Sequence, residues 1–250
     1  MTNKFDRKGK RLNWTMARRA ESSYNSRLRQ VAKQIGAIIK GFSPDGHLSD
    51  VEAVLRALKQ YSVMLQPWAR AVANYMLTDV ARRDYRMWQA HSKDISSSIR
   101  SELLNAPTGS AYAALMEEQV GLITSMPLDA GQRVHRLVQE AMTTGQRPDV
   151  IRKEILRSGL VSESKARLIA RTEVARSAAT FTQARAQFAG SEGYLWRTSK
   201  DSDVRPLHKA MEGKFVLWSD PPKLEASLAP YHAGCGPNCR CFAEPVLPDL

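Results

Sequence analysis

The sequence predicts an α+β protein, in which a mostly α-helical N-terminal region is followed by a small antiparallel β-sheet module packed on a long helix. Two observations lead to this fold class. Up to about residue 190, apolar residues recur at three- and four-residue steps, interrupted by short clusters rich in Gly, Pro and Asn. Beyond that point the period changes to that of strands. We expect a basic helical arm at residues 1–45, a helical domain at 46–160 and a C-terminal α+β module at 161–250.

The predicted arm is the most basic part of the chain. Its first forty residues hold eleven Lys and Arg against only Asp6 and Glu21. From about Leu12 its apolar residues form one stripe opposite the basic face, at Leu28, Val31, Ile35, Ile38 and Ile39. Such a helix can lie on DNA, on an acidic protein or against the protein's own core.

Breaks in the pattern separate the helices that follow. Gly-, Pro- or Asn-containing clusters lie at 41–46, 105–110, 145–149 and 158–160. Ser49 or Asp50 can cap a helix that starts at Val51, and Pro67 suits the first turn of the next, whose spacing continues to about Leu104. Further helices are predicted over 111–125, 129–143 and 150–156, and from about Ser162 onward. Three strands are predicted at 194–198, 214–218 and 240–246.

Composition restricts the class of protein. The formal net charge is +12, and a field of this sign attracts polyanions, either DNA or an acidic protein surface. A solvated basic surface that only aids solubility is the alternative. No run of about 18 apolar residues occurs, so we expect no membrane-spanning helix. The polar N-terminus lacks the apolar core of a signal peptide, which favours folding in a cytoplasm.

Three polar motifs occupy the last third of the chain. The first is Leu168–Arg176, which contains Arg171-Thr172-Glu173. The second contains Asp201, Asp203, Arg205, Pro206 and His208, and the third is Gly236-Pro237-Asn238-Cys239-Arg240-Cys241. In order and spacing they resemble the phage head morphogenesis family, typified by the minor head protein F of phage Mu.

The resemblance implies that the first motif packs against the second as a polar core. The residues of this network are Arg171, Glu173, Arg176, Asp201, Asp203, Arg205 and His208. Pro206 favours a short helix, which places Arg205 and His208 on one face. A carboxylate such as Asp201 or Glu173 can accept a bidentate hydrogen bond from Arg205 there. A surface ion pair between Glu173 and Arg176 is the simpler interpretation.

The cysteines suggest a metal site. All three lie near the C-terminus, and an odd number of clustered cysteines does not indicate a disulfide framework. Cys239 and Cys241 are two apart, so in an extended strand both thiols face one side. With Cys235, His232 and His208 they offer enough ligands for tetrahedral, structural zinc. Packed thiols, with Asn238 and Arg240 fixing the turn, are the alternative.

The resemblance implies a minor capsid protein of a tailed phage. Such a protein associates with the portal, and with scaffold or major capsid protein, inside the head, and acts in procapsid assembly and in DNA packaging or exit. It meets packaged DNA through non-specific electrostatics, after assembly in the host cytoplasm. The motifs lack a serine or cysteine nucleophile pattern, so we expect no enzyme. Two alternatives are a zinc-dependent DNA-processing enzyme using His208, Asp201 and Asp203, and a non-enzymatic DNA-binding protein.

Overall fold

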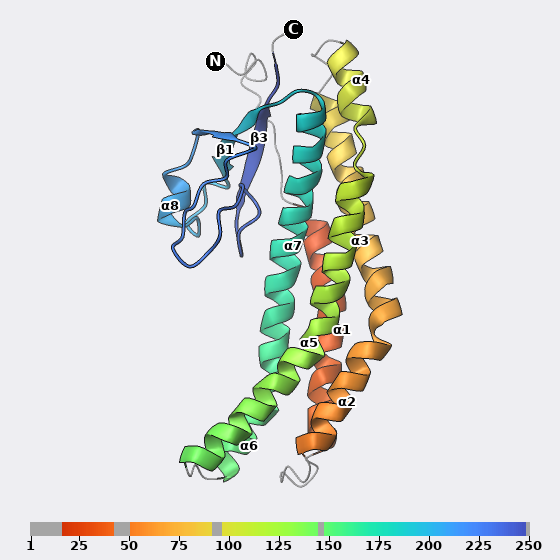
Figure 1. Cartoon of the computed structure of the whole chain (residues 1–250), viewed down its shortest axis with the longest axis vertical. Coiled ribbons are helices and arrows are strands. Elements are labelled where there is room, and N and C mark those ends of the chain that lie inside the picture. Colours follow the sequence, from red (N-terminus) through yellow and green to blue (C-terminus); the bar gives the residue numbers. More distant parts are fainter. Residues whose placement is uncertain (1–16, 43–50, 92–96, 145–147, 249–250) are drawn as a thin grey trace. The chain divides into compact units, whose positions relative to one another are not determined.

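The computed structural model describes residues 17–42, 51–91, 97–144 and 148–248, and the predicted α+β class is confirmed (Figure 1). The helices are α1 (Arg18–Gly41), α2 (Val51–Met64), α3 (Gln66–His91), α4 (Ser97–Asn105), α5 (Gly109–Thr144), α6 (Pro148–Leu156), α7 (Ser158–Phe188) and α8 (Pro206–Lys209). The strands are β1 (Gly193–Thr198), β2 (Phe215–Leu217) and β3 (Cys241–Val246). No helix in the described ranges is long and apolar enough to cross a membrane.

The described residues form two compact units, each assembled from segments far apart in the sequence. One unit comprises the described residues of 1–20, 76–115 and 171–250, and the other comprises those of 21–75 and 116–170. The division at 45 and 160 that we expected from the sequence stays a prediction. We call the unit that contains 171–250 the C-terminal unit and the other the helical unit.

In the helical unit, the apolar stripe of α1 is used inside the protein. Leu28, Val31, Ile35 and Ile39 are at most 1% exposed, so this face belongs to the unit's own core. Tyr24 on the same face donates a hydrogen bond from its hydroxyl to Gln119 Oε1 of α5 (2.9 Å). Apart from Arg27, which is half-buried over the Tyr75 ring, the basic residues of α1 are exposed and lie away from this face.

The helix expected from Pro67 to about Leu104 is described as two helices, α3 ending at His91 and α4 beginning at Ser97. Two further helix boundaries differ from the sequence prediction. α5 continues through Pro127 as one helix where two were predicted, over 111–125 and 129–143, although proline lacks the N–H that would bond to Ile123 O. Ser125 supports this turn, because its hydroxyl lies 3.0 Å from Leu122 O and 3.3 Å from Asp129 Oδ2.

The second difference is the start of α7, at Ser158 instead of Ser162. Ser162 lies inside this helix and donates to Ser158 O (2.9 Å). Gly159 does not end a helix: a Cβ built on it would lie 3.1 Å from the Cα of Gly36 in α1. It is therefore a point of close helix approach.

The sheet of the C-terminal unit has the strand order β2-β1-β3, and both pairings are antiparallel. All three strands form where they were predicted, and Pro206 opens α8 as expected. On β1, Tyr194 and Trp196 are fully buried, as a period of two requires for one face. Strand β3 carries Cys241, which lies opposite Thr198 of β1.

Aromatic side chains form the core of the C-terminal unit. Tyr194, Trp196 and Trp218 pack with Ala186 of α7 and with Trp88 of α3, which is 1% exposed. The Tyr194 and Trp218 ring centroids are 4.4 Å apart. The sheet module is therefore packed on the last turns of α7, as expected, and it also requires α3.

Candidate functional site

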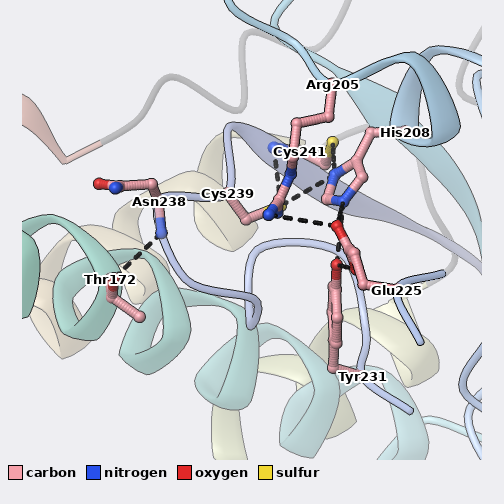
Figure 2. A network of polar contacts seen from close by, with 8 residues as sticks. All are labelled: Thr172, Arg205, His208, Glu225, Tyr231, Asn238, Cys239 and Cys241. Carbon is pink, nitrogen blue, oxygen red and sulfur yellow. Dashed lines mark hydrogen bonds and ion pairs between the residues drawn. The ribbon is translucent and has the colours of Figure 1, made fainter. Parts of the chain in front are cut away.

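The structure places the third motif against the first motif, which lies on α7. The backbone N–H of Asn238 donates to Thr172 Oγ1 (3.1 Å; Figure 2). Asn238 has φ 53°, a left-handed conformation that asparagine tolerates. Gly234, with φ 89°, lies against α7, where an added Cβ would meet Ala179 Cβ at 3.4 Å. The loop that carries the cysteines is thus held directly on the helix that carries Arg171-Thr172-Glu173.

Within the first motif, Glu173 and Arg176 form an ion pair (3.3 Å). Glu173 is only 6% exposed, so this is not the surface pair of the simpler interpretation. Burial lowers the pKa of Arg176, and the neighbouring Cys235 thiol acts against that shift. Arg171 is half-buried on the same helix.

The second and third motifs meet through Arg240. Its guanidinium contacts Asp201 (2.7 Å) and Asp203 (3.0 Å), which fixes the turn before α8 to the residue before β3. The hydrogen bond from Arg240, together with that from Ser199, lowers the pKa of Asp201. Both aspartates are therefore engaged in binding Arg240.

The carboxylate that binds Arg205 was wrongly predicted. Arg205 contacts Glu225 Oε1 (3.1 Å), and neither Asp201 nor Glu173 is this partner. Glu225 lies in the loop between β2 and β3 and also accepts a hydrogen bond from the Tyr231 hydroxyl. These contacts hold the pKa of Glu225 below its usual value, although burial acts to raise it.

His208 is the centre of the site, and its two ring nitrogens have different surroundings. Nε2 lies 3.1 Å from Glu225 Oε1 and 2.9 Å from the Tyr231 hydroxyl. Nδ1 lies 3.3 Å from Cys241 Sγ and 3.5 Å from Cys239 Sγ (Figure 2). The side chain of His208 is buried under Trp196, whose ring meets the imidazole edge-on at 5.6 Å.

The two thiols of this site are electrostatically unequal. The hydrogen bond from Cys241, reinforced by His208 and backbone N–H groups, lowers the pKa of Cys239 despite its burial. The pKa of Cys241 is raised, because it donates to Cys239 and is buried. Burial acts to lower the pKa of His208, but its hydrogen bond to Cys239 and the charge of that thiolate raise it overall. These directions favour Cys239 over Cys241 as the sulfur that carries negative charge.

Three of the five predicted metal ligands come together. The ligand atoms of His208, Cys239 and Cys241 all lie within 4.8 Å of one another. Cys235 and His232 stand outside this group. His232 packs edge-on against the Trp218 ring (5.6 Å), and its Nδ1 lies 3.3 Å from the Tyr194 hydroxyl. Burial raises the pKa of Cys235 to about 12.

Sequence reasoning missed Glu225 and Tyr231 as members of the site. Their loop carried no motif, and only its prolines indicated order. One local signal existed: Gly236 is placed so that a Cβ would lie 2.6 Å from the Tyr231 ring. The third motif therefore needs glycine at this position to admit the ring of Tyr231.

Residues 132–244 are similar to the family described as Phage Mu protein F like protein, and we call this segment the Mu F-like region. The family model of that description matches this segment, which confirms the resemblance to the phage head morphogenesis family. The Mu F-like region begins in the second half of α5, well before the motifs from which the resemblance was first drawn.

A relative from Haemophilus influenzae, described as an uncharacterized protein, is 26% identical over 254 residues. The match covers 93% of this chain and 54% of the relative, so the chain spans about half the length of that curated protein. Similarity therefore extends beyond the Mu F-like region into the helices before it. No solved structure matches the chain.

Proposed function

We propose that this chain is a minor capsid protein that acts in head morphogenesis of a tailed phage, in contact with the portal inside the head. The observation that supports this most is the Mu F-like region, together with the meeting of its three motifs in one unit. Polar residues from α7, from the turn before α8 and from β3 bind one another. A module built in this way is suited to act as a rigid part of an assembly.

The exposed basic face of α1 is the contact surface that we assign to the partner. Because the apolar stripe of α1 is buried in its own unit, binding through this helix uses its charges. Arg19, Lys33 and Lys40 are exposed on it. A positive surface of this kind fits an acidic face of portal or scaffold, or packaged DNA, and the encounter weakens with salt.

The test is co-sedimentation of the purified chain with the cognate portal protein. A triple variant, Arg19→Glu with Lys33→Glu and Lys40→Glu, should lose portal binding, whereas the matched variant Lys59→Glu with Lys153→Glu and Lys223→Glu should keep it. Both change the net charge equally at exposed positions. Equal binding by the two variants would remove α1 from the proposal, and absence of any wild-type complex would remove the portal.

The geometry favours binding over DNA hydrolysis. A DNA-processing enzyme built on His208, Asp201 and Asp203 needs these groups to share one open site. Asp201 and Asp203 instead bind Arg240, and His208 binds Glu225 and the two thiols. We therefore expect no nuclease activity with added Zn²⁺ or Mg²⁺. Cleavage of DNA that disappears in His208→Ala would support the enzyme instead.

A further inference from the structure

We propose that His208, Cys239 and Cys241 hold one Zn²⁺ ion, which ties α8 to β3. This inference does not depend on the proposed function. The ligand atoms are His208 Nδ1 and the two Sγ atoms, and the side chains that carry them are 1%, 2% and 5% exposed. Imidazole nitrogen and thiolate sulfur are the ligands that zinc prefers.

The spacing of these atoms fits a tetrahedral ion. With Zn–N of about 2.0 Å and Zn–S of about 2.3 Å, the nitrogen–sulfur edge of a tetrahedron is about 3.5 Å. The two nitrogen–sulfur distances are 3.3 Å and 3.5 Å. A zinc ion can therefore bind with very little movement of the side chains, so that the binding free energy is not spent on rearranging the core.

The far side of the imidazole is arranged as metal-binding histidines require. Nε2 lies 3.1 Å from the Glu225 carboxylate, so that a proton held on Nε2 would leave the lone pair of Nδ1 available to an ion beside the two sulfurs. Such a carboxylate fixes the tautomer and makes the ligand nitrogen more basic. Glu225 is itself held by Arg205 (3.1 Å) and by the Tyr231 hydroxyl. These contacts therefore hold the imidazole ring of His208 in one orientation.

The backbone supports the sulfur side. The N–H of Cys241 donates to Cys239 Sγ at 3.4 Å, a contact that stabilises negative charge on that sulfur. Trp196 and Ala243 belong to the same core, and the Arg205 guanidinium is a cation near the sulfurs, where it acts to lower the pKa of Cys241. Charge at a buried position is costly unless it is paired or binds a metal ion. A divalent cation compensates both thiolates at once.

Among the described residues, Cys235 and His232 lie outside the group, so we expect a non-protein ligand such as water at the fourth coordination position. These two residues are the matched controls. Zinc content of the full chain, purified from cells with added zinc, should be one ion per chain in the wild type, in Cys235→Ser and in His232→Gln. His208→Ala, Cys239→Ser and Cys241→Ser should each lose it. Equal loss in Cys235→Ser or His232→Gln would overturn the ligand assignment.

A second measurement keeps all three ligands in place, so it does not depend on whether the ligand variants fold. Co²⁺ added to metal-free wild-type protein should give visible bands of tetrahedral cobalt and a thiolate-to-metal charge-transfer band, both reversed by Zn²⁺. Glu225→Gln should keep these spectra and bind Zn²⁺ about 10–100-fold more weakly. Octahedral spectra, absence of the charge-transfer band or unchanged affinity in Glu225→Gln would contradict the proposal.

Discussion

Asp84 and Arg185 carry the most deeply buried ion pair of the C-terminal unit. They are 2% and 6% exposed, and Arg185 Nε lies 2.7 Å from Asp84 Oδ2. Thr182 donates to the same carboxylate (3.0 Å), and Arg185 Nη1 donates to Leu104 O (3.2 Å). A buried ion pair thus joins α3 to α7.

Removing the guanidinium should be costly. We expect Arg185→Met to lower the free energy of unfolding by about 3–5 kcal/mol, because it leaves a buried carboxylate without its cation. The control is Arg70→Met, which breaks an exposed pair with Glu117 (3.0 Å) and should cost about 0–1 kcal/mol. Urea denaturation of both variants measures the difference, and similar costs would mean that burial does not govern this pair.

The same carboxylate predicts a pH dependence. Burial raises the pKa of Asp84 to about 6, against the opposing effects of Arg185 and Thr182. The folded chain thus holds a proton that the unfolded chain releases near pH 4, so this group's contribution to stability falls as pH rises from about 4 to about 6. Asp84→Asn should flatten the stability curve in that window. An unchanged slope would contradict the raised pKa.

The sequence predicted those site residues whose signal is local. Cys239 and Cys241 share a face because a strand has a period of two, and Pro206 placed His208 at a helix start. Glu225 had no such signal, because its role arises only when its loop folds back over α8. Cys235 and His232 were included because they are near in sequence, but their ligand atoms lie outside the group.

At the scale of elements, α1 and α7 approach each other through two glycines. A Cβ built on Gly159 would lie 3.1 Å from Gly36 Cα, whereas one built on Gly36 would lie 3.5 Å from Gly159 Cα. The sequence indicated a helix end at Gly159, because glycine more often ends helices than packs them. Only the neighbouring helix explains why glycine is needed here.

This asymmetry can be tested by three alanine substitutions. Gly159→Ala should lower stability by about 1–3 kcal/mol, because the contact is too close. Gly36→Ala makes an ordinary contact and should be near neutral. Gly121→Ala, in open space on α5, should raise stability by about 0.5–1 kcal/mol through helix propensity. Thermal unfolding of the three variants gives the order, and a stabilised Gly159→Ala would show that the helices can separate easily.

At the scale of the whole molecule, compact units do not follow the order of the chain. The C-terminal unit takes in residues 76–115 as well as 171–250. Trp88 of α3 lies in the same aromatic core as Trp196 and Trp218. Periodicity and breaks locate helices but not their partners, so no sequence pattern indicated that α3 completes the sheet module.

A fragment consisting of residues 161–250 should therefore not fold on its own. It lacks Trp88 and Asp84, and leaves Arg185 without its carboxylate. We expect weak near-ultraviolet circular dichroism and no cooperative unfolding. In the full chain, Trp88→Ala should cost about 3–5 kcal/mol. A cooperatively folding fragment would support the predicted boundary at 161.

The interleaved C-terminal unit has a consequence during synthesis. Residues 76–115 emerge from the ribosome long before β3, which pairs with β1 and carries Cys241. At roughly 5–20 residues per second, the helices wait on the order of ten seconds for the strand that completes their core. During that interval Trp88 is open to other partners, so yield in the cell should depend on chaperone supply more than the modest size of the chain suggests.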